Sequence, residues 1–598
     1  MDPRLIQLFS SATPDSPVVA DRESLCRDAA KCGYIIHPDV QNEDVALFIS
    51  QQQADLNSTF YKRWEDVKSR SRWQLFLDQV RHYATTYGSG YAPSQPRYIP
   101  NDGAETPDFS HYTLISPISG DELFERCLAL LTSGAALRND TLLPLCEVVA
   151  ERWKSAPESA SIGDIRNREA SAILYKCLGR RPEDPVELLR FILFEATGSA
   201  ILIKSPQRME EIRAASGSFD FNTLSVAEIE ALATCFYRFK AIFMALRAPL
   251  NRPVINRIRR LAPRLHRPFA AGFWEGLLAG DATAGDVARK VGEIDNFKIV
   301  RLIQAIRERL LLTAVGSHRL FLIRNGKLFL KPSGAPIPAL QRERLREILA
   351  VLEDALYANL SPRACKVRFP DSLSIACPSS ERNFVGNIPF GSSYRLRGDN
   401  FFCIYWRNEW GARDFDLSMV TFSGRKTGWN ADYNTSDTLY SGDMTDASPE
   451  AAEVIYCKGE CPGGVIYCNR YNGDEGSRFR FCFGSEEIVD LRRNYMVRPD
   501  SMAVSEMLVS DTRQKMVAIV SDGAVFLMDF GIGAARVSGG EGASLFEPVF
   551  ARKAQVFLDL RETLLRAGFT EAAAGETPDI DLSQPDKEVL LSLFSKSR

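Results

Sequence analysis

A change in sequence texture near residue 365 restricts the possible folds of this 598-residue chain more than any other feature. Beyond it the apolar runs become short, β-branched and aromatic, as in NFFCIYW, FDLSMVTF, GGVIYCNRY and KMVAIVSDGAVFLMDF. Gly, Asn, Asp and Ser separate these runs. Many short strands between turn formers are typical of a β-sandwich. We therefore predict a β-sandwich over residues 365–570.

The first two thirds of the chain follow a helical pattern instead. Apolar residues recur at spacings of three and four over residues 226–248 and 286–311, and a stripe of Leu and Ile follows residue 339. Alternating apolar residues flank Asn325-Gly326, a dipeptide that favours a tight hairpin turn. The expected fold class is α+β, with a mostly α-helical N-terminal half to two thirds and a C-terminal β-sandwich.

Several domains are expected, because 598 residues exceed what one hydrophobic core organises. Hydrophobic residues make up 45% of the chain and charged residues 25%, which is ordinary for folded globular domains. Changes of pattern predict a helical domain at 1–110, a helical domain at 111–225, a helical domain with a hairpin near 318–331 at 226–360, the sandwich at 365–570 and a tail at 571–598.

The motifs and the composition of the chain restrict where the protein is located and which reactions it could catalyse. The N-terminus shows no basic stretch followed by an apolar one, and no apolar run reaches the length of a membrane span, so we expect a cytoplasmic protein. Thirteen cysteines without a paired framework fit a reducing compartment. The chain lacks Walker A, H-E-x-x-H, G-x-S-x-G and G-x-G-x-x-G motifs. We therefore expect a protein that is not an enzyme.

The order of short motifs in the β-rich part points to a known kind of domain. A strand ending at Trp406 precedes Asp-Phe-Asp-Leu at 414–417, then Tyr-Asn at 433–434 and Tyr-Ser-Gly-Asp at 440–443. This order resembles the TerD-type domains of bacterial tellurium-resistance and stress operons. The segment RLAPRLHRP at 260–268 is similar to a pattern upstream of that domain in larger actinobacterial and myxobacterial TerD-containing proteins.

The resemblance implies a calcium site, because acidic residues at these motifs bind calcium in the family. Ca²⁺ takes oxygen ligands from carboxylates, carbonyls and water. The matching positions are Asp414, Asp416 and Asp443, with Asn434 nearby in the pattern. Ser418 stands where the family has another carboxylate, and the family's acidic loop is absent, so we expect calcium to bind weakly or not at all. Alternatively, these aspartates cap strands and turns.

The resemblance also implies a function. The chain would be a non-enzymatic component of a bacterial stress-response or tellurium-resistance system, with other proteins of a stress operon as its partners. The helical part would be an interaction scaffold. The sandwich would bind calcium or a partner.

A basic segment indicates an alternative function. Residues 236–274 carry nine Arg and Lys and no Asp or Glu. Four aromatic residues interleave with the first of them: Phe236, Tyr237, Phe239 and Phe243. Such a surface suits phosphate binding and base stacking, so the alternative is an RNA-binding protein. Its candidate site residues are Arg252, Arg257, Arg259, Arg260, Arg264 and Arg267. Alternatively, these arginines lie on solvated helix faces and pair with acidic residues of neighbouring helices, an interpretation that the near-zero net charge of -3 favours.

Four cysteines lie close together in the sequence, at Cys457, Cys461, Cys468 and Cys482. Tetrahedral zinc sites use four such ligands, but the C-x3-C-x6-C-x13-C spacing lacks the usual C-x2-C pairs. Most of these cysteines fall in expected strands, where a thiol behaves as a small hydrophobic group. We therefore do not expect zinc.

Overall fold

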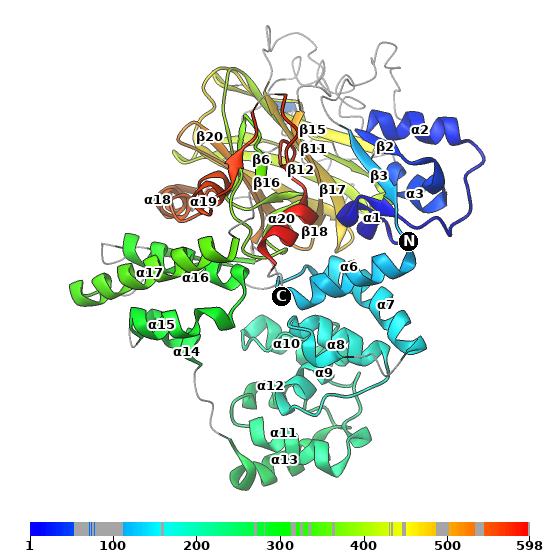
Figure 1. The fold of residues 1–598 in the computed structure, drawn as a ribbon, viewed down its shortest axis with the longest axis vertical. Coiled ribbons are helices and arrows are strands. Elements are labelled where there is room, and N and C mark those ends of the chain that lie inside the picture. Colours follow the sequence, from blue (N-terminus) through cyan, green and yellow to red (C-terminus); the bar gives the residue numbers. More distant parts are fainter. Residues whose placement is uncertain are drawn as a thin grey trace.

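The computed structural model describes most of the chain. The residues that it leaves undescribed are 53–70, 72, 75–76, 78–111, 157–160, 268–271, 280–281, 313–317, 323–326, 333–336, 361–364, 430, 432–434, 445–449, 486–501, 533–542, 574 and 596–598. Helices fill most of the N-terminal part, and antiparallel strands form the C-terminal part (Figure 1). The predicted α+β fold class is therefore confirmed.

A small unit at the N-terminus combines helices with a parallel sheet of order β1-β3-β2. Its elements are α1 (Pro3–Phe9), β1 (Ser11–Ala12), α2 (Arg22–Lys31), β2 (Tyr34–Ile36), α3 (Glu43–Gln52) and β3 (Thr113–Pro117). The helical pattern of the sequence did not predict this sheet. Strands of two to five residues are too short to show an alternating pattern.

A run of helices follows: α6 (Gly120–Thr132), α7 (Asn139–Ser155), α8 (Arg168–Cys177), α9 (Pro185–Thr197), α10 (Pro206–Ala214), α11 (Val226–Cys235), α12 (Lys240–Ala245) and α13 (Arg252–Leu265). The helix predicted over 226–248 is in fact two helices, α11 and α12. Between them the chain turns at residues 236–239, and this turn buries both Phe236 and Phe239. Burial of these rings offsets the lost helical hydrogen bonds.

The next helices are α14 (Phe273–Gly276), α15 (Ala284–Lys290), α16 (Asn296–Leu311) and α17 (Ala339–Leu360). The helix predicted over 286–311 is also divided, because Asp295 caps a new helix by accepting a hydrogen bond from Lys298 N at 2.7 Å. The predicted hairpin is confirmed as β4 (His318–Leu322) paired with β5 (Lys327–Pro332). Its expected Asn-Gly turn lies outside the described residues.

Two large and mainly antiparallel sheets form the body of the C-terminal part. The larger has the order β13-β12-β16-β19-β20-β10-β7, and β5 pairs with β20 in parallel, which joins the hairpin to this sheet. Its strands are β7 (Leu373–Ser374), β10 (Ser393–Arg395), β12 (Ala412–Thr421), β13 (Lys426–Gly428), β16 (Gly464–Gly473), β19 (Gln514–Ser521) and β20 (Ala524–Ile532).

The smaller sheet has the order β14-β15-β11-β17-β18. Its strands are β11 (Asn400–Arg407), β14 (Thr438–Tyr440), β15 (Glu450–Cys457), β17 (Ser477–Ser485) and β18 (Met502–Ser510). The sheets pack face to face, as the ring of Phe415 in β12 shows. It lies 5.9 Å from the ring of Trp406 and 5.3 Å from that of Phe479.

Short elements complete the C-terminal part. They are β6 (Lys366–Arg368), β8 (Phe384–Val385), β9 (Ile388–Pro389), α18 (Ala543–Ala554), α19 (Leu560–Arg566), β21 (Thr570–Glu571), β22 (Ile580–Asp581) and α20 (Lys587–Phe594).

Sandwich and helices share one hydrophobic core, whose buried side chains extend from Leu5 in α1 to Phe594 in α20. The segment 571–598, expected as a tail, contributes Leu590, Leu591 and Phe594 to this core. A second core lies among α9 to α13, at the opposite end of the molecule from the sandwich (Figure 1). Among the described helices, none has the length and apolar character needed to cross a membrane.

Candidate metal centre

The candidate site lies where one edge of the larger sheet meets one edge of the smaller sheet. Asp414 and Asp416 alternate along β12, so their side chains share one face, while Phe415 and Leu417 face the core between the sheets. Asp443 follows β14, the edge strand of the other sheet. Folding thus brings together carboxylates that are 27 residues apart in the sequence.

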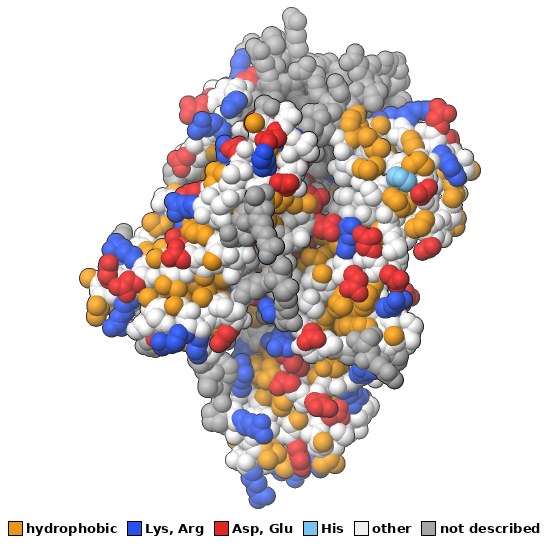
Figure 2. Space-filling view, viewed as in Figure 1, with side chains coloured by type: hydrophobic (Ala, Val, Ile, Leu, Met, Phe, Trp, Pro, Cys, Tyr) orange, Lys and Arg blue, Asp and Glu red, His pale blue; other side chains and the backbone are white. Residues whose placement is uncertain are grey.

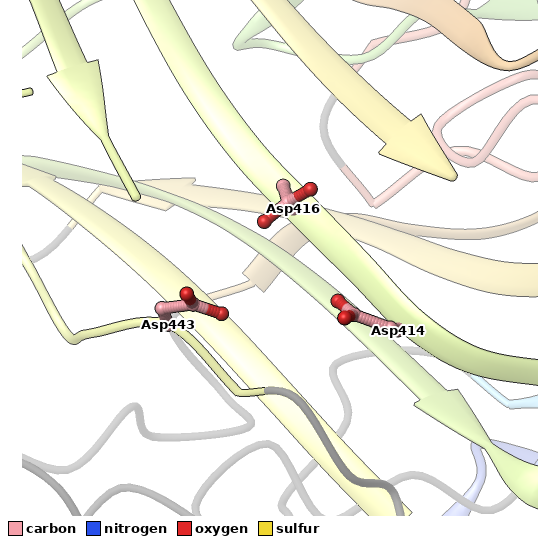
Figure 3. A group of neighbouring side chains, drawn as sticks. All are labelled: Asp414, Asp416 and Asp443. Carbon is pink, nitrogen blue, oxygen red and sulfur yellow. The ribbon is translucent and has the colours of Figure 1, made fainter. Parts of the chain in front are cut away.

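The three carboxylates converge on a shared space. One oxygen from each of Asp414, Asp416 and Asp443 lies within 4.8 Å of the other two, and Figure 3 shows the carboxylates directed toward one another. Asp414 is 2% exposed and Asp416 is 3% exposed. Burying like charges this close together is costly unless protons or a cation neutralise them.

Asn469 adds a further buried oxygen beside the cluster. It lies opposite Asp416 on the neighbouring strand β16, and it is fully buried. Its Nδ2 atom is 3.5 Å from the Oγ atom of Ser418. Neither Oδ2 of Asp416 nor Oδ1 of Asn469 has a hydrogen-bond partner among the described residues. Buried polar oxygens normally have a partner, and a bound cation or water molecule would supply one here.

Glu453 of β15 supports the cluster from the smaller sheet. Its Oε2 accepts a hydrogen bond from Leu417 N at 2.7 Å, and its Oε1 accepts one from Met444 N at 2.9 Å. One side chain therefore holds β12 beside the segment that carries Asp443. The sequence reasoning missed this residue. The sequence feature that could have identified Glu453 is its position as the single charged residue in the apolar stretch AAEVIY.

The electrostatics of the site favour neutralisation of its carboxylates. Burial, followed by the charges of Asp414 and Asp443, raises the pKa of Asp416 well above its usual range, while Lys426 lowers it. Burial and the charges of Asp416 and Asp443 likewise raise the pKa of Glu453. Burial lowers the pKa of Lys426 to about 8, although Asp416 acts in the opposite direction.

Three of the four predicted metal ligands are thus brought together. The fourth, Asn434, lies outside the described residues. Asp414 and Asp416 lie within β12 and pair with β16. Ser418 is fully buried two residues further along the same strand face.

The four cysteines that lie close together in the sequence, Cys457, Cys461, Cys468 and Cys482, are not gathered into one group. The described residues contain one group of His, Cys, Asp and Glu with metal-ligand geometry, and that group is the aspartate triad. Cys457 and Cys461 are neighbours, with their sulfurs 3.1 Å apart. Cys482 instead packs beside Cys403 on a different face of the smaller sheet.

The six predicted nucleic-acid-binding arginines lie on α13 or directly after it. All six are exposed, and none forms an ion pair with an acidic side chain that the structure describes. The alternative is therefore confirmed in its first part, since these arginines lie on solvated helix faces, but the described residues show none of the expected pairing with acidic residues of neighbouring helices. The aromatic residues Phe236, Phe239 and Phe243 are buried, which contradicts the predicted base-stacking surface.

No protein-family model, curated protein or solved structure matches this chain. The geometry of the aspartate cluster is therefore the principal basis for a functional proposal.

Proposed function

We propose that this chain is a non-enzymatic scaffold protein of a bacterial stress-response or tellurium-resistance system, and that its TerD-like sandwich binds Ca²⁺. The ligands are Asp414, Asp416 and Asp443. The observation that carries the proposal is the buried Oδ2 of Asp416, which has no hydrogen-bond partner among the described residues and belongs to a converging carboxylate cluster.

The cluster has the dimensions and chemistry of a calcium site. Two oxygens bound to the same Ca²⁺ lie at most about 5 Å apart, because each Ca–O distance is about 2.3–2.6 Å. The 4.8 Å limit on the three carboxylate oxygens satisfies this condition. All three ligands are hard oxygen donors, which suit Ca²⁺ or Mg²⁺ rather than zinc.

Bound Ca²⁺ would neutralise charge at the junction of the two sheets. Asp414 and Asp416 belong to the larger sheet, whereas Asp443 follows an edge strand of the smaller one. Glu453 already joins the same two segments through backbone hydrogen bonds. The ion would therefore stabilise the edge of the sandwich and the surface that the scaffold presents there to partner proteins.

Binding is expected to be weak. Ser418 supplies no carboxylate where the family has one, and the raised pKa of Asp416 makes protons compete with the ion.

Thermal unfolding tests the calcium site. The melting temperature of the full chain should rise with CaCl₂, because a ligand of the native state stabilises it by mass action. In Asp416→Asn this rise should disappear. The calcium-free melting temperature of this variant should not fall, because the change removes a buried charge.

Asp437 provides a matched control for this experiment. It lies six residues before Asp443, its side chain is 47% exposed, and it does not belong to the cluster. Asp437→Asn should keep the full calcium response. If chelation leaves the melting temperature of the parent protein unchanged, or if Asp416→Asn responds to calcium like the parent, the proposal is wrong.

A further inference from the structure

Helix α13 presents a broad basic surface at the end of the molecule farthest from the sandwich. Lys and Arg side chains reach the lowest point of Figure 2, where Figure 1 places α13. We define the arginine face of α13 by six exposed side chains: Arg252, Arg257, Arg259, Arg260, Arg264 and Arg267. This face lies outside the calcium site and does not depend on it.

No described acidic side chain neutralises the arginine face, and two acidic groups of the surrounding helices form ion pairs with other arginines. Glu228 of α11, the helix that packs on α13, forms an ion pair with Arg181 at 3.4 Å. Glu211 of α10 pairs with Arg208 at 3.1 Å. None of the six arginines forms an ion pair with a described residue. Six cations on one surface create a positive potential that attracts polyanions.

The opposite side of α13 fixes the arginine face toward solvent. Ile255, Ile258 and Ala262 are fully buried in the core that α9 to α13 share. Rotation of the helix would expose these side chains and would lose several kcal/mol of hydrophobic free energy, at about 1.5–3 kcal/mol for each large side chain. The arginine face is therefore preformed.

Asn251 anchors the start of the helix. Its Oδ1 accepts a hydrogen bond from Phe221 N at 3.0 Å, and its Nδ2 donates to Ser216 O at 2.8 Å and to Phe219 O at 2.9 Å. At the other end, Arg267 N donates to Thr234 O at 3.0 Å. Both ends of the basic surface are thus held in place by buried or backbone groups, so little ordering entropy is lost on binding.

A ligand of the arginine face would be a polyanion, and it would bind without inserting an apolar group into the protein or receiving one from it. A membrane-surface helix inserts its apolar face into the lipid, but the apolar face of α13 is already buried in the protein. Single-stranded nucleic acid is held by stacking on exposed aromatic rings, whereas Phe236, Phe239 and Phe243 are buried. Tyr237 is 47% exposed, and its ring packs edge-on against His266.

We propose that the arginine face of α13 binds the phosphate backbone of double-stranded nucleic acid without reading its sequence. The helix has 14 residues and is about 20 Å long, and a duplex presents one phosphate charge for about every 1.7 Å of its axis. Several arginines can therefore contact phosphates at the same time. Guanidinium groups suit this contact, because they pair with phosphate oxygens in a bidentate manner.

Fluorescence anisotropy with a labelled 20-base-pair RNA duplex and a DNA duplex of the same length tests this proposal on the full chain. Both duplexes should bind at 50 mM salt, and affinity should fall more than about tenfold by 200 mM salt, because binding releases counterions. The triple variant Arg257→Gln, Arg260→Gln, Arg264→Gln should lose at least about tenfold in affinity at 50 mM salt and should show a shallower salt dependence.

The triple variant Arg213→Gln, Arg344→Gln, Arg346→Gln is the matched control. These residues are also exposed and lie on α10 and α17, and Arg346 pairs with Glu343 at 3.0 Å, so the control removes the same number of charges from other surfaces. It should bind like the parent protein.

Four results would overturn the proposal. The first is no duplex binding by the parent protein at 50 mM salt, and the second is a loss of duplex affinity in the control variant equal to that in the arginine-face variant. The third is tighter binding of single-stranded RNA than of the duplex, with Tyr237→Ala abolishing that binding. The fourth is binding of phosphatidylserine vesicles through the same arginines with an affinity equal to that for the duplex.

Discussion

The Oε2 atom of Glu453 accepts a hydrogen bond from the backbone nitrogen of Leu417 at 2.7 Å, although the two residues belong to different sheets. The other carboxylate oxygen of Glu453 accepts a bond from Met444 N. Glu453 is fully buried, so both backbone groups depend on it for their hydrogen bonds. The strand that carries Asp416 is thereby fixed to the segment that carries Asp443.

Removal of this side chain should therefore destabilise the sandwich. Glu453→Ala leaves two buried N–H groups unsatisfied, at a cost of about 1–3 kcal/mol each, and the free energy of unfolding should fall by roughly 2–6 kcal/mol. Glu453→Gln keeps one acceptor oxygen and should lose about half as much. Urea unfolding followed by tryptophan fluorescence measures both changes. Glu460→Ala, at an exposed position, should stay within about 0.5 kcal/mol of the parent.

The pH dependence of stability should depend on calcium. The folded-state pKa of Asp416 is raised, so its contribution is present below the unfolded pKa and is lost as pH rises through the folded value. In calcium-free buffer the melting temperature should fall as pH rises from about 4, the ordinary pKa of an aspartate. Calcium competes with the proton, so the calcium-induced rise should be larger at pH 8 than at pH 5.

Asp416→Asn isolates this effect from other buried acids, including Glu453, whose pKa is also raised. The difference in melting temperature between variant and parent should change with pH in calcium-free buffer. A constant difference from pH 5 to pH 8 would show that Asp416 does not titrate as the structure indicates.

A second buried charge group connects the sandwich to the helices. Lys515 Nζ lies 2.5 Å from Asp529 Oδ1, and Arg138, which directly precedes α7, contacts the other carboxylate oxygen. The side chain of Asp529 is 1% exposed and that of Lys515 is 4% exposed. Burial alone would raise the pKa of Asp529, but Lys515 and Arg138 outweigh it and hold the pKa below its usual range.

Asp529→Ala should destabilise the protein by about 3–5 kcal/mol, because it removes the buried counter-ion that the two cations share and leaves Lys515 with only the half-exposed Asp511. Guanidinium unfolding measures the change. Glu23→Ala breaks the exposed pair with Arg27 and should cost at most about 0.5 kcal/mol. If the two variants lose similar stability, Asp529 does not hold the helices to the sandwich.

Gly428 packs against the site strand closely enough to exclude any side chain. It has φ +148°, and an added Cβ would lie 2.9 Å from the backbone oxygen of Leu417. Gly428→Ala should therefore displace β13 from β12, reduce the unfolding free energy by about 1–3 kcal/mol and weaken calcium binding. Gly424→Ala would meet no atom within 4 Å and tests the effect of a positive φ alone. Calorimetry of both variants separates the clash from the backbone strain.

The fold class and most of the candidate site could be predicted from the sequence, because the residues that define them lie close together along the chain. The short alternating runs identify the strands, and one motif places Asp414 and Asp416 two residues apart on one strand face. The partners of these elements are distant in the chain and could not be predicted. Lys327 pairs with Gly531, and Glu453 reaches Leu417 across the two sheets. Such contacts depend on tertiary packing, which leaves little trace in local periodicity.

Isothermal titration of the full chain with CaCl₂ at pH 7.5 tests the central claim most directly. The parent protein should bind one Ca²⁺ ion, and Asp416→Asn should show no heat of binding while it unfolds as cooperatively as the parent. Asp437→Asn should bind like the parent. No calcium binding by the parent, or undiminished binding by Asp416→Asn, would contradict the assignment of the Asp414, Asp416 and Asp443 cluster as a calcium site.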